Sequence, residues 1–516
     1  MNKSVFCRFS KFSKFGKFGK LMILCFVLTA QLNVAHMTGA SSASSGVFGH
    51  NPNIRVGLVF GGGATASFRT TAPNGFIIGE VRADEPYVFY AQRFIANTSI
   101  AVTRRGDGLA VINTANNAVL HEYTHASNNL AIIAAHPSSG GEFPLRFDEL
   151  SSRTTGFMTT SVNNIYSGAF IYRPRGARLE VIALVCLEDY LKGVVPNEVS
   201  PNWEPEALRA FTVAARSFSV HSILRSRHAA EGFDLCNTSH CQLFIGSRNA
   251  TDRTNAAVTD TRGLVATFEG RVIEAVYHSS SGGVTENHND AWGGEMRYPF
   301  LSSVRLPFEN YRDPGRRNAL WTNRVSPREL FDYLVNQSPQ SALFRNRLNA
   351  PIADIRINAR SPGSNFIRSV SVIDTNGNTV TVETSARIRS AFARFANSAN
   401  MDIYRPSSFR AYLMPADSGA AAQSIETGRT YVMAADGLRR VASSELAVMA
   451  ADGLLRTVQA YAVGTDFIFD GRGWGHGVGM SQWGAQDMAL LGYGFEQIVK
   501  TFYTGVSIQR LTEMDR

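Results

Sequence analysis

The stretch LEDYLKGVVPNEVSPNWEPEALRAFTVAARSF, residues 187–218, holds the densest cluster of unusual residue choices in the first half of the chain. Its pattern predicts a helix over 188–195 that stops near Pro196. A longer helix is expected from Pro205, because the fixed φ of proline suits the first helical position. One apolar stripe runs along this second helix: Leu208, Phe211, Ala215 and Phe218.

Glu198 lies between the two expected helices, on a connector with two prolines. Its apolar neighbours are Val195, Val199 and Trp203. Desolvation beside such side chains raises the pKa of a carboxyl group toward the value that a general acid needs. On a solvated loop, by contrast, a glutamate keeps its ordinary pKa. On the second helix, Arg216 is predicted to orient Glu198 or to bind an anion, unless it lies at the surface as most helical arginines do.

Upstream of these helices the chain has the pattern of an antiparallel β region. Apolar or alternating runs, separated by turn residues, begin at Ile54: IRVGLVF, GFIIGEV, YVFYAQ, TSIAVT and LAVIN. The chain is therefore predicted to have a mixed α+β fold, with a β-rich N-terminal region, a helical catalytic segment and an inserted α+β module.

Residues 305–465 are predicted to be that insertion. A helical pattern, SPRELFDYLVNQ, precedes three strand patterns, and Asn376-Gly377 between the last two is typical of a tight hairpin turn. The helical period returns in SARIRSAFARF. A repeat follows, VMAADGLRR at 432 and VMAADGLLR at 448, and it predicts a pair of small hairpins with Asp-Gly turns.

Residues 1–43 have the order of a secretory signal: basic residues, the apolar run LMILCFVLTA and then small residues. The apolar run is short for a membrane span, so membrane attachment is expected only through an uncleaved signal. The protein is therefore expected to be exported, to the periplasm or to the cell wall and extracellular space. Without this segment the formal net charge falls from +9 to +3, which gives no reason to expect nucleic acid as a partner.

Cys236, His240 and Cys241 lie close together in DLCNTSHCQLFIG, and thiolate and imidazole groups are zinc ligands. His228 upstream is a candidate fourth ligand for a tetrahedral site. Such a closed site is structural and has no open position, so no cofactor is required for catalysis. The alternative is a Cys236–Cys241 disulfide, which export favours, although a bridge gives no reason for a histidine beside the second cysteine.

The segment YHSSSGG, residues 277–283, is expected to form the polar wall of a groove. Tyr277, Ser279 and Ser281 lie at every second position and so share one face of a strand. A serine hydrolase is the alternative. However, His278 is adjacent to Ser279, and adjacent strand residues point to opposite faces, so the histidine is badly placed as its base.

Together these stretches resemble the stage II sporulation protein D family, which includes the amidase enhancers. The resemblance rests on four motifs in the family's order: residues 187–218, CQLFIG, YHSSSGGVTEN with AWG, and GRGWGHGVGMSQWGAQDMALLGYGFEQIVKTFYTG from residue 471. It implies a lytic transglycosylase that cuts the MurNAc–GlcNAc bond of peptidoglycan glycan strands already stripped of stem peptides by an amidase. It also places the family's catalytic glutamate at Glu198, its helical arginine at Arg216, and zinc near the cysteine-containing motif.

The last motif has glycine at every second position from 471 to 479. On an extended segment this pattern removes side chains from one face, so that a glycan strand could lie against the backbone while Trp474 and His476 point the other way. Stacking on sugar rings is expected from Trp474, and hydrogen bonds to sugar groups from Gln482. The alternative is that the glycines permit tight packing against the helix of residues 205–225.

These expectations divide the chain into a catalytic core of residues 54–304, a module of residues 305–465, and a Gly-rich segment of residues 466–510 that completes the core. The expected function is cleavage of glycan strands with release of 1,6-anhydro ends, in cell-wall remodelling or sporulation. A noncatalytic glycan-binding enhancer of a partner amidase is the first alternative, and a zinc hydrolase is the second.

Overall fold

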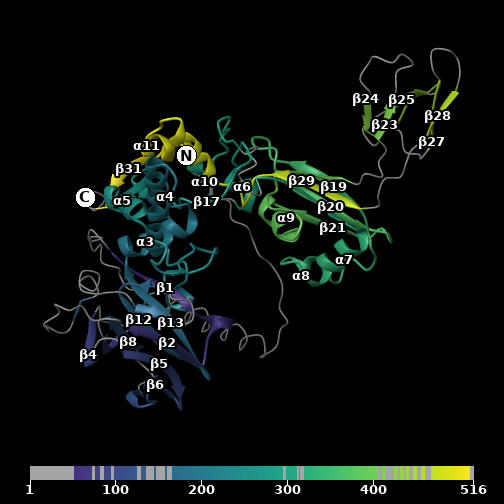
Figure 1. Ribbon diagram of the computed structural model, residues 1–516. Helices are drawn as coiled ribbons and strands as arrows, with labels where there is room; N and C mark the ends of the chain where they lie inside the picture. Colours follow the sequence, from purple (N-terminus) through teal and green to yellow (C-terminus); the bar gives the residue numbers. More distant parts are fainter. Residues whose placement is uncertain are drawn as a thin grey trace, which may run out of the picture. The chain divides into compact units, whose positions relative to one another are not determined.

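The computed structural model of the chain contains both helices and sheets in quantity, which confirms the predicted α+β class (Figure 1). The expected signal, residues 1–43, lies outside the described residues. Among the described helices, none has both the length and the apolar character needed to cross a membrane. The structure describes residues 52–511 except 73–75, 82–86, 95–97, 125–128, 135–144, 147–156, 160–164, 295–297, 311–312, 314–318, 405–409, 414–422, 427–430, 435–436, 441–444, 450–454 and 460–465.

Two sheets make up the described N-terminal part of the chain. The larger sheet has the spatial order β14 (Leu235–Cys236), β1 (Asn53–Val59), β13 (Arg178–Cys186), β12 (Ala169–Arg175), β8 (Asn129–Ala134), β3 (Phe76–Val81), β4 (Tyr87–Phe94), β9 (Leu145–Arg146). The smaller has the order β11 (Ile165–Tyr166), β10 (Phe157–Thr159), β2 (Ser67–Ala72), β5 (Thr98–Arg105), β6 (Gly108–Asn113), β7 (Val119–Tyr123). Neighbouring strands are antiparallel except β1 and β14, which pair in parallel.

The predicted β region is confirmed, because the five apolar runs correspond to β1, β3, β4, β5 and β6. Between the sheets lies a core of aliphatic and aromatic side chains such as Val56, Val102, Phe170 and Val181, all fully buried. Each buried methylene of such a core contributes about 0.8 kcal/mol. Strand β13, which pairs with β1 and β12, leads without a loop into α3 (Leu187–Glu198), the first described α-helix, so the sheet determines where that helix begins.

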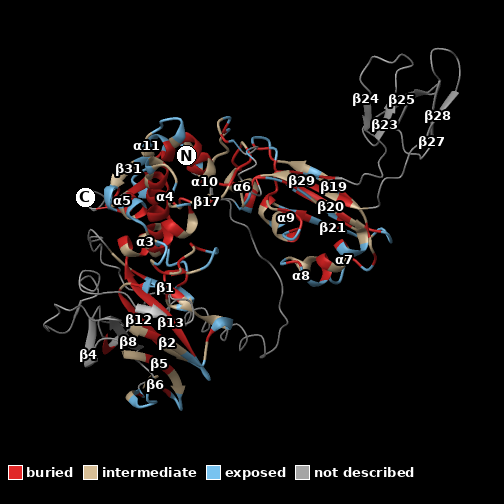
Figure 2. Cartoon of the chain, viewed as in Figure 1, coloured by how far each residue is buried: buried red, intermediate tan, exposed pale blue. Residues whose placement is uncertain are grey.

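Helix α4 (Pro205–Leu224) is the centre of the helical part and is buried along most of its length (Figure 2). Pro205 is its first residue and the predicted apolar stripe is buried, as expected. Four helices pack against it: α3 (Leu187–Glu198), α5 (Asp252–Asp260), α10 (Gln482–Leu490) and α11 (Phe495–Phe502). The smaller elements nearby are η1 (Gly61–Gly63), η3 (Ala229–Glu231), β15 (Leu264–Phe268), β16 (Arg271–Val272), β17 (Tyr277–His278), α6 (His288–Trp292), η4 (Pro299–Leu301), β30 (Met480–Ser481) and β31 (Ser507–Arg510).

Helix α3 is longer than expected. The prediction that it stops near Pro196 is wrong, since the helix continues to Glu198 with the proline in its last turn. A proline there removes one backbone N–H donor, while the side chain of Asn197 adds a bond of 2.6 Å to the carbonyl oxygen of Gly193 in the same turn. Glu198 is therefore the last residue of a helix and not part of a loop.

The inserted module has its own hydrophobic core, which includes Val325, Leu334, Val370 and Phe392. Asn376 and Gly377 lie in the turn between β20 and β21, as the hairpin signal predicts, and Gly377 has a φ of +86°. The elements of the module are β18 (Leu320–Val325), α7 (Pro327–Asn336), α8 (Ser341–Phe344), β19 (Ile352–Arg360), β20 (Ile367–Asp374), β21 (Thr379–Glu383), α9 (Ser385–Ala391), β22 (Met401–Tyr404) and β29 (Phe467–Arg472).

The module ends later than residue 465, because β29 is the middle strand of its sheet. This strand pairs with both β18 and β22, and Phe467 and Phe469 are buried in the module's core. Arg472, the last residue of β29, is thus where the chain leaves the module.

The internal repeat forms two hairpins, as predicted. One is β25 (Tyr431–Ala434) with β26 (Gly437–Arg440), and the other is β27 (Glu445–Met449) with β28 (Leu455–Gln459). A third two-stranded sheet joins β23 (Arg410–Leu413) to β24 (Gln423–Glu426).

Four of the five alternating glycines of the C-terminal motif have left-handed φ angles, between +71° and +109°: Gly473, Gly475, Gly477 and Gly479. Because such backbone is not an extended strand, the prediction of a flat glycine face for a sugar is wrong. A Cβ at Gly475 would lie 2.9 Å from His278 Cβ, and a Cβ at Gly479 would lie 2.1 Å from the carbonyl oxygen of Val276. Gly473, Gly475 and Gly479 thus permit close packing against residues 276–281, and Gly477 permits it against Phe366, 2.6 Å from its Cβ position. None of the four packs against the helix expected from the sequence.

Gly479→Ala is expected to destabilise the protein more than Gly492→Ala. Both residues have positive φ, +71° and +86°, so alanine is strained by about 1 kcal/mol at either position. Only at Gly479 would a Cβ also meet the backbone, since no atom lies within 4 Å of a Cβ at Gly492. We expect the loss in free energy of unfolding to be larger by about 2 kcal/mol at Gly479, measured with urea. Equal losses in the two variants would contradict the packing role.

Candidate active site

The carboxyl group of Glu198 is held by groups from three segments outside its own helix. Its Oε1 accepts a hydrogen bond of 2.7 Å from the backbone N–H of Leu243. The side chains of Tyr277 and Gln482 also bond to the carboxyl group. Tyr277 lies on β17, and Gln482 is the first residue of α10. The fold thus brings together three residues that were singled out from separate motifs.

Burial raises the pKa of Glu198 above its ordinary value, and the three hydrogen bonds to the carboxylate oppose part of that rise. The direction agrees with the expectation from its apolar neighbours. Val195 and Val199 are buried in the core, and Trp203 packs at the edge of the core with its ring 4.8 Å from that of Trp483. A carboxyl group with a raised pKa keeps its proton closer to neutral pH and can donate it to a substrate oxygen.

Gln242 fixes the phenol of Tyr277 and was not identified from the sequence. Its Nε2 donates to the Tyr277 hydroxyl at 3.3 Å, while its Oε1 accepts from Tyr190 at 3.2 Å and Ser219 at 2.8 Å. Burial raises the pKa of Tyr277, so its hydroxyl stays protonated and donates to Glu198. In the sequence Gln242 is only a polar residue beside a cysteine, and nothing local marks it as buried.

Arg216 lies in the core and does not orient Glu198. Its Nε and Nη2 donate to the two carboxylate oxygens of Glu188, at 3.0 and 2.8 Å. The remaining donors bond to the Thr261 hydroxyl and to two backbone carbonyl groups. With its N–H groups used in this way and its side chain fully buried, the predictions of a catalytic role and of a surface position are both wrong. Arg216 ties α3, α4 and α5 together.

Ser281 is fully buried and does not line a groove, so that prediction is wrong. Its backbone N–H donates to Glu309 Oε1 at 3.0 Å, and its hydroxyl donates to the same carboxylate. The hydroxyl of Ser280 also donates to Glu309, at 2.7 Å. Ser279 is half-buried, and its carbonyl oxygen accepts from the backbone N–H of Trp483 at 3.0 Å, so Ser279 stays a candidate substrate contact.

Aromatic side chains lie near the C-terminal glycines. Trp474 is 41% exposed. The ring of His476 lies 5.5 Å from that of His278 and 5.1 Å from that of Trp292. Burial lowers the pKa of His476, and its Nδ1 accepts from the backbone N–H of Val478 at 3.1 Å, so the imidazole is neutral. Trp292 is 40% exposed and lies beside His476, so it is a further aromatic candidate for contact with a sugar, one that was not identified from the sequence.

The four predicted metal ligands lie together. The ligand atoms of His228, Cys236, His240 and Cys241 are all within 4.8 Å of one another. His228 Nε2 is 3.2 Å from Cys241 Sγ, and both cysteines are free, in contrast to the disulfide alternative. The other ring nitrogen of His228 faces Glu231 at 3.6 Å, a typical partner for a zinc-bound histidine. Two thiols and two imidazoles so arranged fit a tetrahedral zinc ion.

Residues 175–268 match the sequence model of a known family, SpoIID, described as stage II sporulation protein. The match includes Glu198 and the four potential metal ligands, and it ends before Tyr277 and the Gly-rich segment. The chain therefore carries a domain of the stage II sporulation protein D family, which confirms the resemblance seen in its motifs.

Several relatives extend the similarity beyond this domain. An uncharacterized protein of Brachyspira hyodysenteriae is 27% identical over 343 residues, which are 66% of this chain and 72% of the relative. The amidase enhancer of Bacillus subtilis is 26% identical over 324 residues, 62% of this chain but only 40% of that longer protein. The stage II sporulation protein D of the same organism is 25% identical over 355 residues, 66% of this chain and 78% of the relative.

Arg216→Lys is expected to lower the free energy of unfolding by about 3 kcal/mol, because lysine cannot reproduce the two-pronged contact with Glu188 and leaves a buried carboxylate poorly paired. Arg209→Lys is the matched control on the same helix. Its pairs with Glu206 and Asp260 are partly exposed, so a loss below about 1 kcal/mol is expected. Normal stability of Arg216→Lys would contradict the structural role.

Proposed function

We propose that this protein is an exported lytic transglycosylase that cleaves the MurNAc–GlcNAc bond of peptide-stripped peptidoglycan strands and leaves 1,6-anhydro ends. The family and the names of the relatives support a role in the cell wall or in sporulation. The observation that carries the proposal is the carboxyl group of Glu198, which burial keeps protonated to higher pH and which three hydrogen bonds hold in place.

One carboxyl group suffices for this reaction. Glu198 donates its proton to the bridging oxygen as the bond from that oxygen to the muramic acid C1 breaks. The C6 hydroxyl of the same sugar then attacks C1, and its proton passes to the Glu198 carboxylate, which restores the acid. Because the nucleophile belongs to the reacting sugar, its effective molarity can reach about 10⁵ M. A hydrolase with a separate water would instead need a second carboxylate.

The neighbours of Glu198 suit both halves of this cycle. Tyr277 and Gln482 donate to the carboxylate after it has lost its proton, so the ionised form is not left unpaired in a buried site. Trp474, with a large exposed ring, and the half-buried Ser279 are candidate contacts to the sugar. His476 is neutral and packed, so it would contribute a surface for the sugar and not a charge.

Glu198→Gln is expected to fold and to bind glycan strands but to release no anhydro product, because an amide cannot transfer the proton. Wild-type protein is incubated with peptide-free strands, and mass spectrometry distinguishes anhydro ends from hydrolytic ends by one water. Glu286→Gln is the matched control, because Glu286 is a buried glutamate whose pKa burial raises, as burial raises that of the half-buried Glu198. Residual cleavage by Glu198→Gln, or equal loss in a folded Glu286→Gln, would sink the single-carboxylate mechanism.

A noncatalytic enhancer of a partner amidase is the second candidate, and the name of the Bacillus subtilis relative supports it. The same assay separates the two functions. Pure wild-type protein that binds strands without cleaving them, yet accelerates an added amidase, would favour the enhancer.

We also infer a structural zinc ion at His228, Cys236, His240 and Cys241. When bound, the ion would cross-link the segments before and after η3. It would have no catalytic role, since four protein ligands leave no open position. These residues lie just before Gln242 and Leu243, so the ion would stabilise the loop that holds Glu198.

Metal analysis of protein purified without a metal-affinity tag is expected to find one zinc ion per chain. Cys241→Ser should lose the metal and lower the melting temperature, because metal binding contributes folding free energy. Cys186→Ser is the control, since that buried cysteine on β13 bonds to Asp189 and is not among the four ligands. Zinc-free protein with a Cys236–Cys241 bridge would refute the site.

A further inference from the structure

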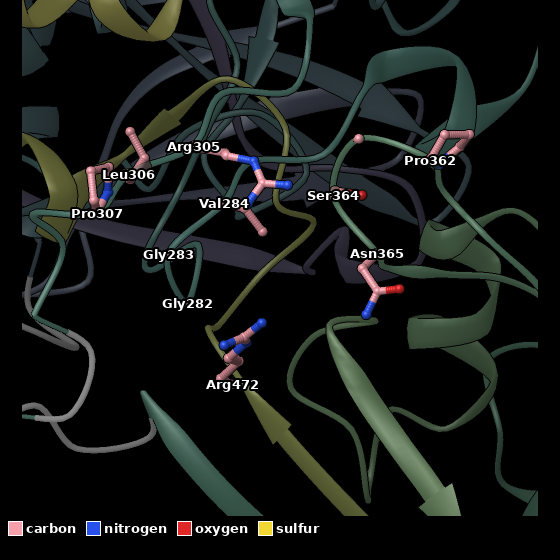
Figure 3. Close-up of a pocket in the computed structure, with 11 residues that line it drawn as sticks. Gly282, Gly283, Val284, Arg305, Leu306, Pro307, Pro362, Ser364, Asn365 and Arg472 are labelled. Carbon is pink, nitrogen blue, oxygen red and sulfur yellow. The ribbon is translucent and has the colours of Figure 1, made fainter.

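A cavity of about 600 Å³ lies among residues 282–284, 305–307, 362–365 and Arg472 (Figure 3). Its lining includes neither Glu198 nor any of the three residues that bond to the Glu198 carboxyl group. The groups that can direct the proton of Glu198 are therefore not those of the cavity but the side chains packed around the carboxyl group. Behind these side chains lies Gln242, which bonds to Tyr277.

The amide group of Gln242 is fully buried, and its hydrogen-bonding capacity is used completely. Its Oε1 accepts from the hydroxyls of Tyr190 and Ser219, at 3.2 and 2.8 Å. Its Nε2 donates to the carbonyl oxygen of Ala215 and to the hydroxyl of Tyr277, both at 3.3 Å. These four bonds match the two acceptor positions and the two N–H donors of a glutamine amide.

The neighbours of this amide determine which way it points. The Ala215 carbonyl oxygen can only accept, so the Gln242 atom beside it is the nitrogen and not the oxygen. The reversed amide would set two acceptors against each other in the core, where an unpaired polar group is costly. Gln242 therefore donates to the Tyr277 hydroxyl and does not accept from it.

This bond fixes the single hydrogen of the Tyr277 phenol. Because the phenol oxygen accepts from Gln242, its hydrogen points away from the amide and is available to Glu198. Burial is the main cause of the raised pKa of Tyr277, and within that rise the bond from Gln242 lowers the pKa while the bond to Glu198 raises it. These opposite effects are those of a phenol that accepts from the amide and donates to the carboxylate. The ring is held by Phe211, 4.8 Å away at an angle of 77°.

The three groups that bond to the Glu198 carboxyl group are all donors: the Leu243 N–H, the Tyr277 hydroxyl and the Gln482 side chain. They stabilise the carboxylate, but in this arrangement none of them accepts the proton of the acid form. Of the three, the Tyr277 hydroxyl is the one that becomes an acceptor simply by turning its hydrogen away. Gln242 opposes that turn, because it would bring the phenol hydrogen against the amide N–H.

We propose that Gln242 is a positioning residue that keeps the Tyr277 hydrogen directed at Glu198, so that the acidic proton is left to the substrate oxygen. The delivery to substrate rests on the proposed function, whereas the direction of the hydrogen is a property of the free protein. Without Gln242 the phenol can turn and accept the proton of Glu198, in competition with the substrate. The carboxylate then also loses one of its donors.

The test follows the Glu198 carboxyl group of the full-length protein by ¹³C NMR, with its signal assigned by its absence in Glu198→Gln. Gln242→Met keeps the length of the side chain and removes its polar atoms. Loss of the fixed donor to the carboxylate favours the protonated form, so the midpoint is expected to rise by about one pH unit. Tyr277→Phe should raise it at least as much, because the donor is then absent.

In the Tyr277→Phe background, Gln242→Met is expected to add no further rise, since Gln242 acts through Tyr277. Gln242→Glu serves in the same comparison if methionine prevents folding, because it keeps the acceptors for Tyr190 and Ser219. The matched control is Gln486→Met. Gln486 is also buried, but it bonds to the backbone N–H of Glu204, so its loss should lower stability and leave the Glu198 midpoint in place.

An unchanged midpoint in a folded Gln242 variant would overturn the proposal, and so would a rise of the same size with and without Tyr277. Cleavage is measured separately. The alkaline limb of kcat/KM should move upward with the midpoint, because the general acid must be protonated. The expected NMR shifts without cleavage would leave the role of Gln242 standing and refute the transglycosylase, whereas cleavage without these shifts would do the reverse.

Discussion

The largely desolvated carboxyl group of the half-buried Glu198 requires polar partners, and the fold supplies them from distant parts of the chain. A buried charge without partners costs several kcal/mol. Leu243 comes from the loop after the cysteines, Tyr277 from β17 and Gln482 from α10. The first turn of α3, at the opposite end of the helix from Glu198, is anchored separately by the Arg216–Glu188 pair. The site therefore exists only when the core and the C-terminal segment fold together.

The Gly-rich motif serves this site through the backbone. β17 pairs in parallel with β30, with Tyr277 opposite Met480 and His278 opposite Ser481, so Gln482 follows directly at the start of α10. Gly473, Gly475 and Gly479 allow the chain to approach residues 276–281 more closely than any side chain would permit. The motif thus places Gln482 beside Tyr277, and its glycines need not touch the substrate.

Features with a local physical cause could be predicted from the sequence. The five N-terminal strands follow from apolar runs, the start of α4 from Pro205, and the Asn376-Gly377 turn from the φ that glycine tolerates. The four clustered thiol and imidazole side chains were also predicted, because cysteine and histidine have few other roles in such a pattern.

Features that depend on long-range packing were missed. The partner of Arg216, Glu188, lies on another helix, and nothing in the local sequence distinguishes this arginine from a surface one. The same holds for Ser281. Its alternation with Tyr277 and Ser279 predicted a groove wall, but its partner Glu309 lies elsewhere in the chain and holds it in the core. The strand β29 was separated from its module because its partners, β18 and β22, come much earlier in the chain.

The most direct test of the proposed chemistry is a titration of the glutamate carboxyl carbons by ¹³C NMR. One carboxyl signal that is absent in Glu198→Gln should have its midpoint clearly above the ordinary glutamate value of about 4.3. A midpoint for Glu198 at or below that value would mean that hydrogen bonding outweighs burial. The residue would then be ionised at neutral pH and unable to protonate the leaving oxygen, which would contradict its role as the general acid.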